Sequence, residues 1–242
     1  MRYLLKNFYV LHQMKKSLFF VFVFTASLAS AQNFNIGIKS GIGTSRYSFD
    51  DDLEYVSSDR TTAVSVKKIG SVVSYNIGAI SKIDLPVVPV SARLGLQYTN
   101  LGGQVEVREY ATNFNRYISE HNGRIDIPIQ LSVNLSKFRI IGGVGYAIDI
   151  ARSTAVVDYL NSTFVETGRF DFAVQSEKQN YWTYNVGAGF ETQNWGLEVL
   201  WEGPMSENIS SNADQSVFTF APNAGQFSVN FTYYLLNRKK KD

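Results

Sequence analysis

Residues 124–135 read RIDIPIQLSVNL and alternate strictly between two kinds of side chain. Every second position from Ile125 to Leu135 is Ile, Leu or Val, and the alternate positions from Arg124 to Asn134 are Arg, Asp, Pro, Gln, Ser and Asn. A period of two residues is the geometry of a β-strand, because successive side chains point to opposite faces of the sheet. The stretch therefore predicts a strand with one apolar face and one polar face.

The same alternation recurs in seven further stretches. They are residues 34–43, 73–82, 90–99, 138–149, 182–191, 195–202 and 227–235. The connections between the eight stretches are alternately long (about residues 50–68, 102–123, 151–180 and 203–224) and short (84–89, 136–137 and 192–194). An up-and-down antiparallel barrel has this pattern, because alternate connections lie at opposite rims. The sequence thus predicts an all-β, eight-stranded antiparallel up-and-down barrel with both chain ends on the rim of short turns.

The composition of the non-apolar face separates a membrane barrel from a soluble barrel of the lipocalin type. Water-facing strands favour Lys, Glu and Thr, whereas this face is rich in glycine and in charges of both signs. These residues are Gly37, Gly41, Gly43, Gly78, Gly95, Gly143, Gly145, Gly187, Gly189, Gly196, Arg93, Arg124, Asp126, Arg139, Asp149, Glu191 and Glu198. Small residues and balanced charges suit the crowded interior of a narrow barrel. The sequence therefore favours a transmembrane barrel of the outer-membrane type, and a soluble secreted barrel remains the structural alternative.

The apolar face also carries aromatic residues near the predicted strand ends. They are Tyr75, Tyr98, Phe138, Trp182, Tyr184, Phe190, Trp195, Trp201 and Tyr233. Membrane barrels place such residues in girdles at the two lipid–water interfaces.

The first residues have the pattern of a cleaved export signal. Lys15 and Lys16 precede an apolar run over residues 18–24, and Ala29-Ser30-Ala31 has the A-x-A pattern of a cleavage site. The predicted organisation is a signal peptide over residues 1–31, with Met14 as an alternative start, a barrel domain over 32–236 and a charged periplasmic tail over 237–242. The remaining 211 residues carry 19 basic and 21 acidic side chains, so nucleic acid is excluded as a partner.

Three segments resemble the PorT-like outer-membrane β-barrel family of Bacteroidetes. They are residues 34–41 (FNIGIKSG), 125–131 (IDIPIQL) and 142–146 (GGVGY). The resemblance spans essentially the whole exported chain and rests on short structural motifs. It implies an eight-stranded outer-membrane barrel without shared catalytic residues, in a family whose name-giver is linked to protein secretion. The Lys-rich end after Leu236 departs from barrels that end on an aromatic residue.

Candidate chemical sites are few. The chain has no Cys, which excludes disulfides, thiolate zinc sites and thiol nucleophiles. His121 lies beside Glu120 and Ser119, and these three residue types occur together in hydrolase active sites. Adjacency in the sequence is poor evidence for a catalytic geometry, so we expect an exposed loop histidine. The acidic segment Asp50 to Glu54 lacks the spacing of a calcium loop and is interpreted as a solvated loop.

Two further patterns are interpreted as structural. The pairs Gly41/Gly43, Gly143/Gly145 and Gly187/Gly189 do not complete a dinucleotide-binding motif and are expected to line the barrel. Glu198 and Glu202 are expected to be internal ion-pair partners rather than a glycosidase pair. We therefore predict no catalytic, cofactor-binding or metal-binding residues.

The sequence favours a non-enzymatic, monomeric outer-membrane protein. Its barrel interior is expected to be filled, and its mobile extracellular loops to serve a structural or interaction role within an envelope or secretion assembly. Expected partners are outer-membrane lipid and lipopolysaccharide, periplasmic chaperones and the barrel-assembly machinery during biogenesis, and an envelope protein. A narrow channel for small solutes and a barrel enzyme acting on lipid or peptide are the alternatives.

Overall fold

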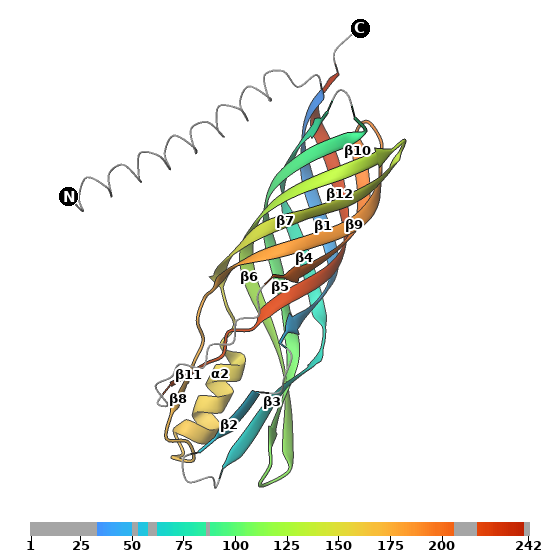
Figure 1. Ribbon diagram of the computed structural model, residues 1–242. Coiled ribbons are helices and arrows are strands. Elements are labelled where there is room, and N and C mark those ends of the chain that lie inside the picture. The colour runs from blue at the N-terminus through green and yellow to red at the C-terminus, as the bar shows by residue number, and fades with distance from the viewer. Residues whose placement is uncertain (1–32, 50–52, 58–61, 86–87, 206–216, 240–242) are drawn as a thin grey trace, which may run out of the picture.

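Eight strands close into an antiparallel ring (Figure 1). The computed structural model describes residues 33–49, 53–57, 62–85, 88–205 and 217–239. The ring consists, in spatial order, of β1 (Asn33–Ser48), β4 (Val72–Asp84), β5 (Val90–Glu109), β6 (Phe114–Leu135), β7 (Phe138–Ala151), β9 (Asn180–Glu191), β10 (Trp195–Pro204) and β12 (Asn223–Lys239). Each of the eight predicted stretches lies in one of these strands, and the pairing of β1 with β12 closes the barrel. The predicted barrel topology is confirmed.

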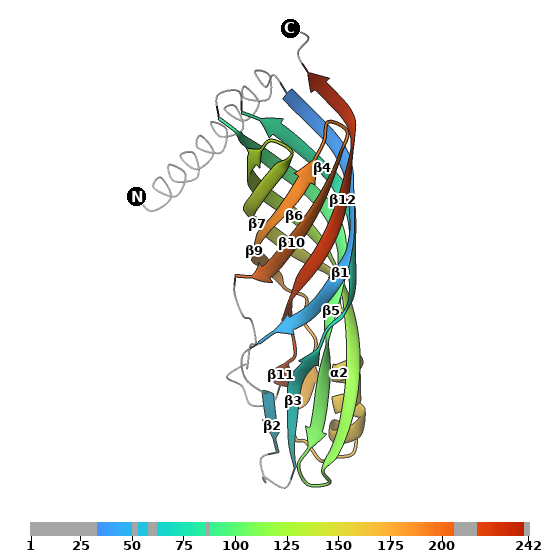
Figure 2. The same ribbon diagram turned by 90° about the vertical axis from the view of Figure 1, so that its right-hand side faces the viewer.

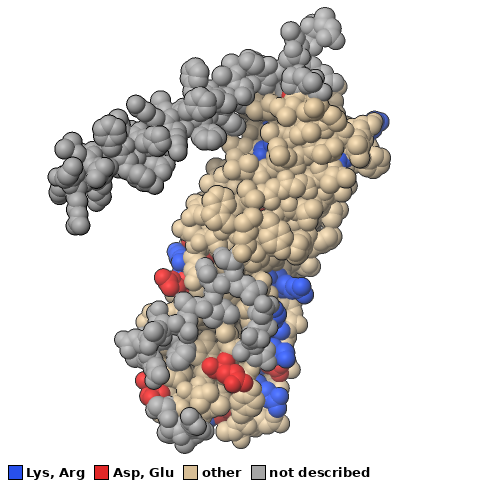
Figure 3. Space-filling view, in the orientation of Figure 1, with Lys and Arg blue, Asp and Glu red and all other residues tan. Residues whose placement is uncertain are grey.

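The apolar face of each strand points outward and the polar face points inward. Leu131 and Phe138 leave 59% and 66% of their surfaces exposed, whereas Arg124 and Arg139 leave 1% and 2%. Figure 3 accordingly shows an upper wall almost without charge above a lower part where charged side chains gather. Water does not favour a continuous apolar belt of this size, but lipid does. This orientation rules out the soluble barrel and identifies an outer-membrane β-barrel.

Two levels of aromatic residues border the apolar belt. Ring contacts join Tyr75 to Tyr98, Tyr146 to Trp182 and Tyr184 to Trp201 at one level, and Phe138 to Phe190 and Trp195 to Phe231 at the other. On β7 the two levels are marked by Tyr146 and Phe138. Eight residue steps span about 27 Å along a strand and about 20 Å along the axis of a barrel tilted by about 40°, close to the roughly 25 Å of a membrane-barrel belt. Eight of the nine aromatic residues expected in girdles thus lie in these ring contacts, and Tyr233 is 50% exposed on the same outer face.

Beyond the barrel, the long connections build a second folded unit (described residues 49–70, 101–122, 152–179 and 217–224). We call it the extracellular domain, after the orientation expected from the sequence. β5 and β6 run out of the barrel into it, and β3 (Ala63–Gly70) and β2 (Leu53–Val56) extend their sheet (Figure 2). The domain also contains α2 (Ala155–Leu160), the π-helical turn η1 (Asn161–Val165) and the parallel pair β8 (Ala173–Gln175) and β11 (Val217–Thr219).

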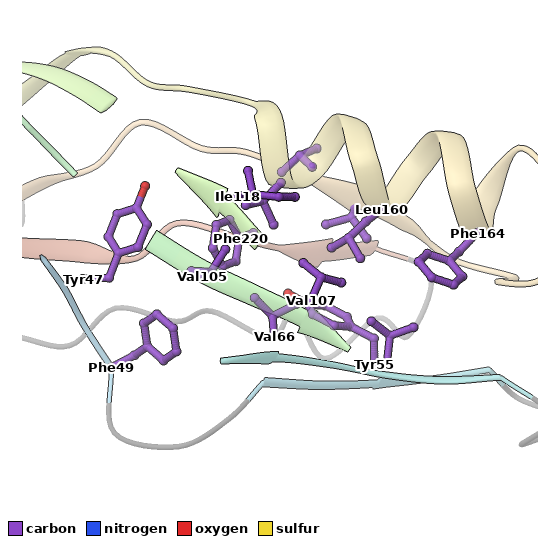
Figure 4. Packing of buried hydrophobic residues seen from close by; sticks show 14 of the residues in the cluster. Tyr47, Phe49, Tyr55, Val66, Val105, Val107, Ile118, Leu160, Phe164 and Phe220 are labelled. Carbon is purple, nitrogen blue, oxygen red and sulfur yellow. The ribbon is translucent and has the colours of Figure 1, made fainter. Parts of the chain in front are cut away.

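The extracellular domain has its own hydrophobic core. Tyr55 and Val66 from β2 and β3, Val107 from β5, Ile118 from β6 and Leu160 from α2 pack together (Figure 4). Because one core joins residues from all four long connections, the expectation of mobile extracellular loops is wrong for the described residues. Among those residues, no helix is long and apolar enough to cross a membrane.

The opposite rim consists of short turns and holds both described ends of the chain. The β6–β7 turn is only Ser136 and Lys137, and Ser136 adopts a φ of 61°, as tight hairpin turns require. β12 continues through Lys239, opposite Asn33. The strand thus includes the first three residues of the predicted 237–242 tail. The predicted signal peptide and residues 240–242 lie outside the described residues.

Candidate functional site

The barrel interior contains a network of ion pairs centred on Glu198 of β10. Its carboxylate lies 2.7 Å from Lys39 Nζ, 2.9 Å from Arg93 Nη1 and 2.9 Å from Arg139 Nη2. The three cations come from β1, β5 and β7, so the network crosses the lumen between strands that are not neighbours. All four side chains are at least 95% buried. Buried charge is tolerated when it is paired in this way, and the network fills the lumen instead of lining a passage.

Further ion pairs fill the two ends of the lumen. Towards the extracellular domain, Arg124 Nε lies 2.7 Å from Asp126 Oδ1, and the same guanidinium contacts Glu202. Towards the short turns, Lys82 and Arg139 both contact Glu191. Glu198 and Glu202 therefore belong to separate ion-pair groups, as expected for internal partners rather than for a glycosidase pair.

Little space is left between these groups. A cavity in the middle of the described barrel has a volume of about 10 Å³ and is lined mainly by polar residues such as Lys39, Asn76 and Gln97. That volume holds about one water molecule. A wider cavity of about 260 Å³ opens at the short-turn rim beside Lys82 and Arg139. Side chains therefore occupy most of the middle of the described barrel, as the prediction of a filled interior requires.

The glycines of the inner face allow neighbouring strands to approach closely. A Cβ on Gly43 would lie 1.9 Å from the carbonyl oxygen of Phe227, and one on Gly187 would lie 2.1 Å from that of Val199. These positions exclude any larger residue without a backbone shift. The glycine pairs thus line the barrel, as the sequence predicts.

The residues considered for the hydrolase alternative do not form a catalytic arrangement. Ser119, Glu120 and His121 are consecutive in β6, so the side chain of Glu120 points to the face opposite to those of Ser119 and His121. Ser119 and His121 are exposed, whereas Glu120 is 2% exposed. The carboxylate is turned away from the imidazole and cannot orient it. His121 is an exposed side chain, although it lies in a strand and not in a loop.

Glu120 instead connects the barrel to the extracellular domain. It accepts hydrogen bonds from the Tyr47 hydroxyl at 2.8 Å and from the backbone N–H of Val156 at 2.9 Å. Burial raises the pKa of the Glu120 carboxyl above its usual range, although both hydrogen bonds and Arg152 oppose the shift. Burial and the nearby Glu120 carboxylate also raise the pKa of Tyr47. We call Tyr47, Glu120 and Val156 the Glu120 junction, since it fixes the end of β1 and the start of α2 to β6.

The sequence analysis missed this junction and the core of the domain. Tyr47 lies just past the predicted first strand, and its partner lies 73 residues away, so no local pattern indicates the contact. Asp50 to Asp52 of the acidic segment lie outside the described residues. Glu54 is exposed in β2, where it accepts a hydrogen bond from the Tyr110 hydroxyl at 3.3 Å. Among the described residues, no cluster of His, Asp and Glu could hold a metal ion.

Neither a protein-family model nor a curated protein sequence matches the chain. Two crystal structures of Ail, the attachment invasion locus protein of Yersinia pestis, are similar to it at 11% sequence identity. They cover 84% of this chain and 99% and 98% of the Ail chain, with TM-scores of 0.37 and 0.33. The first is a complex of Ail with the heparin analogue sucrose octasulfate. This similarity is too distant to transfer the role of any residue.

Proposed function

We propose that this protein is a non-enzymatic outer-membrane barrel that anchors an extracellular binding domain, as part of an envelope or secretion assembly. The observation that supports this proposal is the single hydrophobic core shared by all four long connections above a filled barrel. We also propose that the chain is related to the PorT-like family, on the strength of the segments 34–41, 125–131 and 142–146.

The tip of the β5–β6 hairpin is the surface best suited to a protein partner. Tyr110, Phe114 and Tyr117 are 49%, 54% and 61% exposed there, at the end of the domain farthest from the barrel. Aromatic side chains are enriched where proteins bind one another, because they bury a large area at low conformational cost. Lipid does not explain these residues, since they lie beyond the girdle. We assign the tip of the hairpin to an envelope protein partner.

A pull-down from solubilised outer membrane tests this function. The wild-type chain should retain a stoichiometric protein partner, and the double variant Phe114→Ser/Tyr117→Ser should lose it. Leu135→Ser is the matched control, because Leu135 is 55% exposed on the opposite rim. The proposal fails if the wild type retains no stoichiometric partner, or if the double variant retains the same partner as the control.

The two alternative functions have less support. A channel for small solutes requires a lumen wider than a cavity of about 10 Å³. A hydrolase using His121 requires an orienting carboxylate, and that of Glu120 faces away. The binding role therefore remains the function best supported by the geometry.

A further inference from the structure

A trough with a volume of about 440 Å³ lies on the barrel wall next to the extracellular domain. Three aromatic side chains, Tyr184, Trp201 and Phe227, line one part of it, and two cationic side chains, Arg46 and Lys68, line another. The aromatic residues belong to β9, β10 and β12, and the cations to β1 and β3. The trough thus combines residues from the barrel wall with residues from the domain above it.

Two glycines and the end of a strand create this trough. Pairing between β10 and β12 ends at Glu202 and Gln226, and the next residues on the outer face are Gly203 and Gly225. The Tyr184 hydroxyl lies over Gly203, where a Cβ would be 2.6 Å from it. Because neither glycine has a side chain, the outer wall is recessed between the aromatic and the cationic residues.

The height of the trough places it at the lipid headgroups. Tyr184 and Trp201 form one of the ring contacts of the girdle nearest the extracellular domain. Such girdles mark the boundary between hydrocarbon and headgroups. Arg46 and Lys68 lie on the extracellular side of this boundary, and Figure 3 shows cationic side chains immediately beyond the uncharged wall. A ligand in the trough would therefore be a lipid headgroup of the outer leaflet.

The chemistry of the lining indicates the class of headgroup. Arginine and lysine bind phosphate through charge-assisted hydrogen bonds. Exposed aromatic rings such as Trp201 offer a flat apolar face to a sugar ring.

We propose that the trough binds the phosphorylated sugar headgroup of an outer-leaflet glycolipid. The phosphate pairs with Arg46 and with Lys68, and the sugar lies against Trp201. The Lys68 ammonium already donates to the backbone oxygen of Phe49, and its other N–H groups are the donors to the phosphate. This site is separate from the tip of the β5–β6 hairpin. A negative result for the protein partner proposed above would therefore leave this proposal unchanged, and the reverse also holds.

Lipid A in its diphosphorylated and dephosphorylated forms is the probe. The full-length protein, folded in detergent micelles, is titrated with each form, and bound lipid is counted by native mass spectrometry. We expect the wild type to bind diphosphorylated lipid A about tenfold more tightly than the dephosphorylated form, as a few charge-assisted hydrogen bonds would give. Arg46→Gln should abolish this preference, and Trp201→Leu should weaken the binding of both forms.

Lys137→Gln is the control, because Lys137 is an exposed cation in the turn on the opposite rim. It should bind both forms as the wild type does. Lys68→Gln provides a second test of the phosphate contact, with the fold of every variant checked by the mobility of unboiled protein on a gel. Equal binding of both forms by the wild type overturns the proposal, as does an unchanged preference in Arg46→Gln and Lys68→Gln.

Discussion

Glu198 is the carboxylate on which three buried cations of the barrel interior converge. Glu198→Gln leaves Lys39, Arg93 and Arg139 close together without their shared anion. Removing one partner of a buried ion pair typically costs 3–5 kcal/mol, because the remaining charge is neither paired nor hydrated. We expect a loss of about that size in the free energy of unfolding, measured as the urea midpoint of the barrel in lipid vesicles.

An exposed carboxylate provides the comparison for Glu198. Glu177→Gln changes the same chemical group in the extracellular domain, where water solvates it. Such surface substitutions usually change stability by less than about 0.5 kcal/mol. If both variants unfold at the wild-type urea concentration, the interior ion pairs do not stabilise the barrel.

Glu120 should make the stability of the extracellular domain depend on pH. Its folded-state pKa is raised by burial, so the folded domain favours the protonated carboxyl. The resulting stabilisation is fully present below the ordinary glutamate pKa of 4.5 and is lost as pH rises through the higher folded-state pKa. The domain should therefore open more readily at neutral pH than in mild acid.

Protease cleavage within residues 101–123 reports this opening. The cleavage rate of the wild type is measured at several pH values and divided by the cleavage rate of Glu120→Gln at the same pH. This ratio cancels the effect of pH on the protease itself. Glutamine preserves both contacts, since its oxygen can accept from Val156 N–H and its amide can donate to Tyr47. We expect the ratio to rise with pH, and a ratio that stays constant would remove Glu120 as the cause.

At the scale of the elements, the strands of the barrel could be predicted because apolar outward-facing residues alternate with polar inward-facing residues along the whole length of each strand within the membrane. In β5, Leu94, Leu96 and Tyr98 face lipid, and in the extracellular domain the buried apolar residues are Leu101, Val105 and Val107. The apolar positions thus change from even to odd where the strand leaves the membrane. Outside lipid, the outer face meets water and the inner face packs against α2. This change of parity is the signal from which the domain could have been found.

The rest of the extracellular domain could not be predicted from local patterns. Strands as short as β2 and β8, with four and three residues, contain too few positions to show a period. In β2, Tyr55 is buried because Phe172 stacks on it from another connection, where Phe170 and Phe164 continue the stack. Likewise, the barrel register determines which cations lie next to Glu198. The sequence alone therefore indicates which charges point inward but not which of them pair.

Gly103 allows β5 to pass the end of β1 on its way from the barrel to the extracellular domain. A Cβ at this position would lie 2.7 Å from both the backbone nitrogen and the ring of Tyr47. Because a backbone atom cannot move aside cheaply, Gly103→Ala should displace Tyr47 and weaken the Glu120 junction. We expect a loss of about 1–3 kcal/mol, the usual cost of overpacking, measured by protease cleavage of the domain.

Gly142→Ala is the matched control for Gly103. A Cβ on Gly142 would meet no atom within 4 Å, and this glycine lies on the exposed face of β7. The added methyl group should leave the domain as resistant to protease as it is in the wild type. Equal cleavage of both variants would show that the crossing at Gly103 tolerates a side chain.

At the scale of the whole molecule, two separate cores stabilise the two units. The barrel interior is mainly polar, with ion pairs, uncharged polar side chains and glycine beside a few apolar residues such as Ile141 and Leu200, and its apolar outer surface faces lipid. The extracellular domain has the opposite arrangement, with Val66, Val107 and Leu160 inside and a mainly polar exterior apart from the aromatic tip of the β5–β6 hairpin. The solvent around each unit accounts for this difference. Because the cores share few residues, a change in one unit should leave the other folded.

The filled barrel and the domain above it are two separate barriers to ions, and conductance can tell them apart. Gln104 pairs with Ser119, so replacing residues 105–118 by Asn-Gly closes β5 and β6 with a two-residue turn and removes much of the domain core. We expect no sustained current across a planar bilayer for either the wild type or this shortened chain, because the Glu198 ion pairs remain in the lumen. Current that appears only in the shortened chain would show that the domain caps an open pore, and current in both would show that the interior is not filled in the membrane.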